Sequence, residues 1–361
     1  MPRRPLPRAT RPRPGTVPAA PARRGVAIGL GVAILLVAAA WWVISGSVPG
    51  SARDRDLAEA REALGQGRAA VAAAALARAS AGDPRDPEPW LLRLEILRLE
   101  DRQVEAQALG WEAFAAVPVR SRREVLRALT LALLADAPQD VALSTLARWV
   151  AADPNDLDAR VALSRRAADS PRPDDPGRSA RVMTLTGILA AHPSHVAARE
   201  ALVLALADAG DPDRGRLVLE AWPESARDAR YHRLAGRWAL EYDRSPARAM
   251  ASLSLALEAL PHDWRTRARL ARAQTIAGLD PESRSSAEAV ARLRDTLNPL
   301  PLGRRLDADL AALDDPKSRL DLADLCDRVG LKRLAHAWRE DARSPGAEGV
   351  DPLIPGPPRR R

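Results

Sequence analysis

The sequence predicts an all-α protein, and three observations carry that prediction. Alanine and leucine dominate a chain of 361 residues whose aromatic content is only 3%, a composition typical of helices. Runs with alternating polarity are few and no Asn-Gly turn occurs, so the usual signs of strands are missing. Beyond residue 50, prolines recur every 30 to 39 residues, a period typical of stacked helix pairs. These prolines are Pro84, Pro118, Pro154, Pro193, Pro223 and Pro261.

The N-terminal region predicts a membrane anchor. Residues 1–24 are rich in proline, carry seven arginines and no acidic residue, and are expected to form a disordered cytoplasmic tail. Residues 25–46 hold no charge and can span the roughly 30 Å of a bilayer as one helix. Trp41 and Trp42 would lie at headgroup depth on the far side. The tail arginines are Arg3, Arg4, Arg8, Arg11, Arg13, Arg23 and Arg24.

Two further features of this region leave alternatives open. Ala38 to Ala40 could serve as a signal-peptide cleavage site, which would release a soluble exported solenoid. The apolar segment exceeds the roughly 7 to 15 residues of a signal-peptide core, so a retained anchor is favoured. Gly25 and Gly29 form a GxxxG pattern through which helices pair in lipid. A homodimer through these glycines is therefore an open alternative.

The net charge of +8 does not indicate nucleic-acid binding. Ten of the 55 basic residues are arginines in the N-terminal tail and at Arg359 to Arg361, and the remaining 45 are balanced by 47 acidic residues. A nucleic-acid domain needs basic residues concentrated on one face, whereas here arginine and acid alternate. The single cysteine, Cys326, excludes an internal disulfide and any zinc site built from paired thiolates.

Aligned on the prolines, the segments resemble the tetratricopeptide repeat. This family places small residues where two helices cross closely and large apolar residues between them. The first copy fits through Gly67, Ala72, Leu76, Ala79 and Pro84. The second copy fits through Trp90, Ala106, Ala113 and Pro118. The resemblance implies an α-solenoid of about seven to eight helix-turn-helix pairs over residues 53–343, with a concave side.

Later copies fit the pattern less well. The third has Trp149 in place of a small residue, and the fourth is interrupted by the loop 170–177, SPRPDDPG. Copies five to seven follow, and the register is lost over residues 279–315. An eighth pair near residues 322–342 is expected to cap the array. Residues 344–361, rich in proline and glycine, are expected to be disordered.

The sequence offers no set of residues suited to catalysis, a cofactor or a metal. His192 and His195 lie close together, but the proline between them breaks a helix and no cysteine is near. Cys326 has no histidine within a helical turn, so we interpret it as a small buried residue. The sequence contains neither a phosphate-binding glycine loop nor a nucleophile elbow. We therefore predict no catalytic residue, no cofactor and no metal, and we do not expect an enzyme.

The resemblance implies a non-catalytic scaffold that binds a protein or peptide. Together with the predicted anchor, it places the solenoid on the periplasmic face of a bacterial inner membrane. The layout is similar to that of membrane-tethered factors for envelope protein assembly or biogenesis. Two further alternatives stay open: an enzyme with a cryptic site in the solenoid, for example in the loop 171–177, and a cytoplasmic adaptor of reversed topology, which the arginine tail disfavours.

One aromatic stripe is the candidate protein-binding site. Tyr231, Trp238 and Tyr242 stand at i, i+7 and i+11 and share one helical face. The alignment with the family assigns that face to the concave groove. Rigid rings with polar tips are typical of binding hot spots. The alternative is that the rings pack against the neighbouring repeat.

Overall fold

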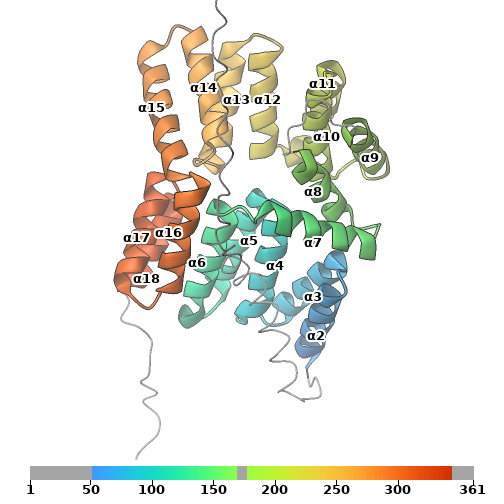
Figure 1. Ribbon diagram of the computed structural model, residues 1–361, viewed down its shortest axis with the longest axis vertical. Coiled ribbons are helices and arrows are strands. Elements are labelled where there is room, and N and C mark those ends of the chain that lie inside the picture. The colour runs from blue at the N-terminus through green and yellow to red at the C-terminus, as the bar shows by residue number, and fades with distance from the viewer. Residues whose placement is uncertain (1–50, 169–176, 344–361) are drawn as a thin grey trace, which may run out of the picture. The chain divides into compact units, whose positions relative to one another are not determined.

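The computed structural model describes residues 51–168 and 177–343 (Figure 1). In these residues the chain forms seventeen α-helices, the short 3-10 helix η1 (Glu224–Ala226) and no strand, which confirms the all-α prediction. The first eight helices are α2 (Ala52–Gly65), α3 (Ala69–Gly82), α4 (Pro87–Leu99), α5 (Gln103–Ala116), α6 (Val119–Leu134), α7 (Gln139–Ala152), α8 (Leu157–Ala168) and α9 (Gly177–Ala191). The others are α10 (Val196–Asp208), α11 (Pro212–Glu220), α12 (Ala229–Glu241), α13 (Pro246–Ala259), α14 (Trp264–Ile276), α15 (Asp280–Thr296), α16 (Pro299–Ala311), α17 (Pro316–Arg328) and α18 (Lys332–Arg343).

Several predictions concern segments outside this description. The anchor at 25–46 with Gly25 and Gly29, both terminal tails, and nearly all of the loop 170–177 fall outside the described residues. Among the helices from α2 to α18, none has the combined length and apolar character that a membrane crossing requires.

Most consecutive helices form antiparallel pairs joined by a tight turn (Figure 1). In six of these pairs, a residue with positive φ ends the first helix. Glycine adopts this left-handed conformation without a steric penalty and is the usual residue after a helix C-terminus. The six residues are Gly67, Asp101, Gly210, Arg244, Gly278 and Gly330.

Small residues lie where the paired helices cross. Ala72 and Ala79 of α3 and Ala106 and Ala113 of α5 have no exposed surface, as the repeat pattern predicts. Ala79 packs in an apolar cluster with side chains of α2, α4 and α7, and Ala106 and Ala113 pack in one with α4 and α6. Each repeat therefore buries its apolar surface against its neighbours, as a stacked array requires.

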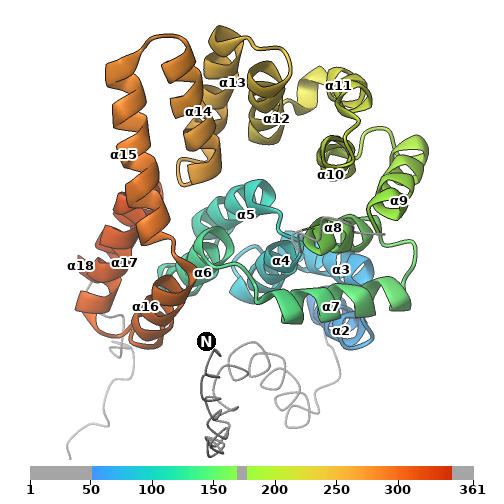
Figure 2. The ribbon, with the colours of Figure 1, turned by 45° about the horizontal axis from the view of Figure 1, so that its top comes forward.

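The third predicted pair is an exception, because α6 and α7 do not pack side by side (Figure 2). Helix α6 packs against α4 and α5, whereas α7 packs against α8. The connection, residues 135–138, contains no residue with positive φ and ends at Pro138. Trp149 is buried in the apolar cluster that includes α2 and α3. The prediction of a third hairpin is therefore wrong, since this connection lacks the tight turn of the other pairs.

The predicted last helix pair is present, and it also contacts an early helix. Helices α17 and α18 pack against each other, and α18 also packs against α6. Their buried side chains form one apolar cluster with those of α6, α15 and α16. Helix α16, in the region where the sequence register is lost, contributes Leu302, Leu306 and Leu310 to this cluster. The C-terminal pair therefore packs on α6 as well as on its neighbours in sequence.

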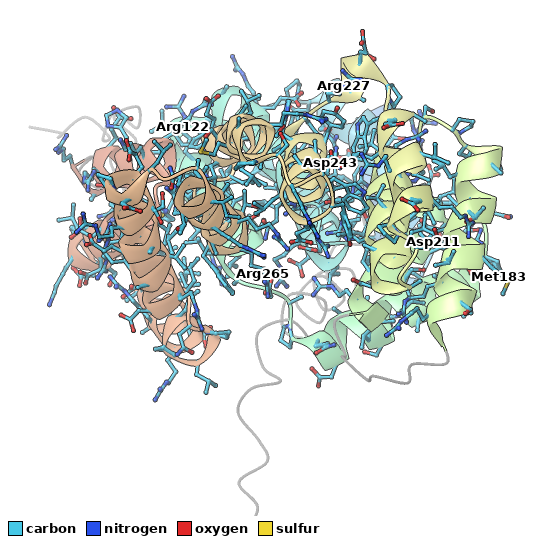
Figure 3. The ribbon with its side chains drawn as sticks, turned by 90° about the horizontal axis from the view of Figure 1, so that it is seen from above. Arg122, Met183, Asp211, Arg227, Asp243 and Arg265 are labelled. Atoms are coloured by element: carbon cyan, nitrogen blue, oxygen red, sulfur yellow. The ribbon has the colours of Figure 1, made fainter. Side chains whose placement is uncertain are left out.

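Ion pairs on the surface join neighbouring helix pairs. Asp243, after α12, pairs with Arg216 of α11 and lies 3.5 Å from Arg248 of α13 (Figure 3). Arg53 of α2 pairs in the same way with Asp86, which caps α4. In both pairs the guanidinium is about one-third exposed and the carboxylate is largely buried. These ion pairs add to the apolar packing that joins the repeats.

Candidate functional site

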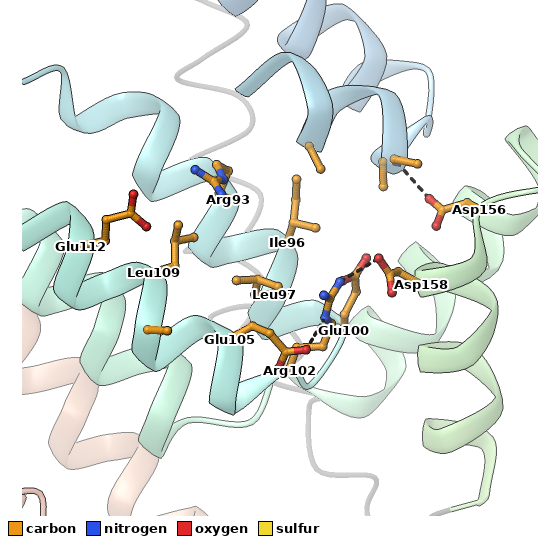
Figure 4. A pocket seen from close by; sticks show the side chains of 14 residues that line it. Arg93, Ile96, Leu97, Glu100, Arg102, Glu105, Leu109, Glu112, Asp156 and Asp158 are labelled. Carbon is orange, nitrogen blue, oxygen red and sulfur yellow. Dashed lines mark hydrogen bonds and ion pairs between the residues drawn. The ribbon is translucent and has the colours of Figure 1, made fainter. Parts of the chain in front are cut away.

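A cavity of about 420 Å³ lies between the first two helix pairs and the start of α8 (Figure 4). One part of its wall is apolar and comes from α3, α4 and α5; it includes Ile96, Leu97 and Leu109. The other part is charged, with five carboxylates and two guanidinium groups. These are Glu100, Glu105, Glu112, Asp156 and Asp158 against Arg93 and Arg102.

Asp156 connects the start of α8 to α3. Its carboxylate accepts hydrogen bonds from Ala159 N at 2.9 Å and from Ala70 N at 3.0 Å. The first bond caps α8 and the second satisfies a free N–H in the first turn of α3. Burial raises the pKa of Asp156, although the two backbone donors act in the opposite direction. One side chain thus holds two sides of the cavity together.

Arg102, just before α5, is shared by three carboxylates. Its Nη1 lies 2.8 Å from Asp158 Oδ2 and 3.0 Å from Glu100 Oε2, and its Nε lies 3.3 Å from Glu105 Oε1. Arg102 therefore joins acidic groups of α4, α5 and α8 (Figure 4). Two of these groups have a further partner, since Glu105 also contacts Arg230 and Asp158 also contacts His195.

The carboxyl groups of Glu100 and Asp158 have pKa values that are shifted in opposite directions. Glu100, at the C-terminus of α4, is only 3% exposed. Burial raises its pKa to about 8; Arg102 opposes the shift and Asp158 adds to it. Burial acts in the same direction on Asp158, but the hydrogen bond from His195 and the charge of Arg102 outweigh it and lower its pKa. At neutral pH, Glu100 is thus mainly protonated, whereas Asp158 is ionised.

A chain of buried charges connects this end of the cavity to later repeats. Glu105 Oε1 accepts a hydrogen bond from Arg230 of α12 at 2.7 Å. Arg165 of α8 donates to Asp101, in the turn between α4 and α5, at 2.8 Å. Glu200 of α10 is fully buried 3.7 Å from Arg165. Burial alone would raise the pKa of Glu200. The positive charges of the surrounding guanidinium groups outweigh the effect of burial, so the pKa is lowered. These contacts hold the cavity wall against α8, α10 and α12.

The arrangement suits binding. Carboxylates beside apolar side chains fit a ligand segment that combines a cationic group with an apolar part. Within residues 51–168 and 177–343, no group of three histidine, cysteine or acidic side chains is placed to hold a metal ion.

The predicted aromatic stripe lies largely in the core. Trp238 is 2% exposed, and its indole Nε1 donates to Pro212 O at 3.3 Å. The rings of Tyr242 and Trp238 lie 5.0 Å apart, and Tyr231 contacts Trp222 edge-on at 5.7 Å. Trp238 therefore packs against the neighbouring repeat and is not accessible to a partner. A binding role for the partly exposed edges of Tyr231 and Tyr242 stays a prediction.

The structure assigns local roles to His195 and Cys326. His195 caps α10, with Nδ1 accepting from Ala198 N at 3.2 Å, and its Nε2 lies 3.3 Å from Asp158 Oδ1. It thereby connects α10 to the cavity end of α8. Cys326 is completely buried in α17, as predicted, and burial raises its thiol pKa to about 12.

Sequence reasoning missed this cavity. One local signal was available: the three consecutive charged residues from Glu100 to Arg102 lie between two helices that contain both apolar and charged residues. The other acidic group comes from Asp156 and Asp158, more than fifty positions later in the chain. Only the packing of α8 against the first repeats brings the two groups together.

Comparisons with known proteins include two solved structures of low similarity and one repeat-family match. A chain in the crystal structure of the APC/C hetero-tetramer Cut9-Hcn1 has 14% sequence identity and a TM-score of 0.42; the match covers 85% of this chain and 59% of that one. A monomeric mutant of IFIT1 with m7Gppp-AAAA has 16% identity and a TM-score of 0.36, with 82% and 70% covered. No curated protein sequence matches the chain. A tetratricopeptide repeat family model matches residues 182–237, which run from α9 into α12, so this segment is similar in sequence to tetratricopeptide repeats.

Proposed function

We propose that this chain is a non-catalytic scaffold that binds another protein on the outer face of a bacterial inner membrane. Residues 25–46 would be its single span, with residues 1–24 in the cytoplasm and the helical repeats in the periplasm. The proposed role is in envelope protein assembly or biogenesis. Tetratricopeptide repeats usually act as scaffolds that bind protein partners, which supports the protein-binding part of this proposal.

The cavity between α3, α4, α5 and α8 is the observation that carries the binding function. It offers an apolar wall next to carboxylates already held in place by capping and ion-pair contacts. A preformed surface of this kind loses little conformational entropy when a segment binds. We therefore place the primary contact with the partner in this cavity.

Site-specific photo-crosslinking in living cells tests the binding function. A photoreactive residue would replace Glu112, at the exposed rim of the cavity on α5, in the full-length chain. The matched control carries it at Glu258, an exposed glutamate on α13, which is also the second helix of its pair. We expect a discrete adduct with a second protein from position 112 and none from position 258. No adduct at 112, or the same adducts from both positions, would contradict the proposal.

Membrane topology is tested separately. A reporter that is active only outside the cytoplasm should function when fused after Arg343, and the protein should stay in membranes after a carbonate wash. Replacing the tail arginines by glutamate should disturb the orientation, because positive charge next to a span keeps that side in the cytoplasm. Release of the protein into the soluble fraction would instead indicate cleavage of the segment.

A further inference from the structure

The apolar face of α6 is covered by the far end of the chain. Because α7 does not pack beside α6, Leu126, Leu129 and Leu133 lack the hairpin partner that other repeats provide. These leucines lie in one cluster with buried side chains of α15 to α18, and each is at most 3% exposed. The C-terminal pair thus covers a face that the next helix in sequence leaves open.

A buried polar contact specifies this packing. The indole of Trp338, in α18, has no exposed surface and donates from Nε1 to Thr130 Oγ1 at 3.0 Å. Thr130 in turn donates to the carbonyl oxygen of Leu126 at 2.7 Å. A buried indole N–H without a partner would cost free energy. This hydrogen bond therefore favours a single placement of α18 on α6.

Charged groups line the edge of the same contact. Arg123 of α6 lies 3.1 Å from Asp341 of α18 and 3.3 Å from Asp314. Asp341 also accepts from Arg319 of α17 at 3.1 Å. Arg319 is 3% exposed, so Asp341 neutralises one buried and one half-buried guanidinium. Partly buried charge pairs of this kind are sensitive to the loss of one partner.

The contact differs in kind from those inside the array. In a repeat protein each unit is stabilised by its neighbours in sequence, but Thr130 and Trp338 are 208 positions apart. Helices α17 and α18 pack more extensively against each other than against α6. The pair can therefore leave α6 without losing its own internal packing.

We propose that the α17–α18 pair is a clasp, which docks on α6 and releases as one body while the remaining helix pairs stay folded. Release uncovers the apolar face of α6 and frees the C-terminal pair from the early repeats. The clasp is an intramolecular contact that does not depend on the acidic cavity.

Hydrogen exchange on the full-length protein tests the clasp. Asp341→Asn should accelerate exchange of amides in α6 by about tenfold or more, because it weakens charge-assisted hydrogen bonds across the contact. Amides of α2 and α3 should be unaffected. The matched control is Asp327→Asn, which disrupts the ion pair with Arg339 inside the C-terminal pair without touching α6.

A second variant removes the α6 partner of the same ion pair. Arg123→Gln should also accelerate exchange in α6. The effect of the double variant should be smaller than the product of the two single effects, because both substitutions remove the Arg123–Asp341 interaction. Equal acceleration in all helices, or no acceleration in α6 for either variant, would overturn the proposal. An effect of Asp327→Asn on α6 as large as that of Asp341→Asn would do so too.

Discussion

The segments α2–α3 and α6–α7 are each followed by a proline of the recurring series, Pro84 and Pro154, yet only the first forms a packed helix pair. Between α2 and α3, Gly67 turns the chain with a φ of +77°, and Ala72 and Ala79 allow the helices of neighbouring units to approach closely. Residues 135–138 contain no such turn, and Trp149 stands where the pattern expects a small residue. Proline spacing therefore sets the length of a unit, whereas the turn and crossing residues decide whether its helices pack together.

This difference has consequences far along the chain. Helix α7 buries Leu146 and Trp149 with the first repeats. Helix α6 is left with an apolar face that α17 and α18 cover. A local failure to form one hairpin is thus linked to a contact between distant parts of the sequence.

Removing a large buried side chain from α3 or from α6 should cause the largest loss in the free energy of unfolding. Leu76 of α3 and Leu129 of α6 are both fully buried. Leu76→Ala and Leu129→Ala should each lower the free energy of unfolding by about 2 to 5 kcal/mol, measured by urea denaturation. Only Leu129→Ala should also accelerate hydrogen exchange in α17 and α18. Unchanged exchange there would show that α6 is not coupled to the C-terminal pair.

Placing a larger side chain where two helices cross should cause the next largest loss in the free energy of unfolding. Ala106 is fully buried where α5 packs against its neighbours. Ala106→Leu should therefore lower the free energy of unfolding by about 1 to 3 kcal/mol. The control is Ala115→Leu, at an exposed position of the same helix. Equal urea midpoints for the two variants would contradict the assignment of Ala106 to the crossing.

The turn between α4 and α5 should make stability depend on pH. The pKa of Glu100 is raised from about 4.5 to about 8 in the folded chain. Between these values the folded chain binds a proton that the unfolded chain lacks, so stability falls as pH rises, by at most about 1.4 kcal/mol per pH unit.

Glu100→Gln removes this titration while keeping a neutral side chain of similar shape. We therefore expect the free energy of unfolding to decline less steeply between pH 6 and 8 in the variant than in the parent protein. Chemical denaturation at several pH values measures both slopes. Parallel curves would mean that the carboxyl of Glu100 titrates as in the unfolded chain.

Substitutions of two glycines in the first repeat should give the smallest change in stability, which comes from the turn between α2 and α3. Gly67→Ala places a side chain on a left-handed residue and should destabilise the protein by about 1 to 2 kcal/mol. Gly65→Ala adds the same methyl group two residues earlier in α2, where nothing lies within 4 Å. That control should be neutral or stabilise by about 0.5 to 1 kcal/mol. Thermal midpoints that shift together would argue against the turn conformation.

The sequence by itself determined the features that depend on neighbouring residues. Alanine and leucine content specifies helices, Gly67 specifies a turn, and Ala72 or Ala106 permits close crossing, because each acts within one or two helical turns or on an adjacent unit. For the same reason, the burial of Cys326 followed from the apolar pattern of its own helix.

Only the tertiary structure decided which distant surfaces meet. It placed Trp238 in the core instead of on a groove, brought Asp158 to Arg102, and packed Trp338 against Thr130. Trp238 packs against a neighbouring repeat, whereas the contact of Trp338 with Thr130 joins helices 208 positions apart and depends on the summed curvature of the repeats between them. Small changes in the angle between successive helix pairs accumulate along the chain, and no local pattern in a single sequence records their total.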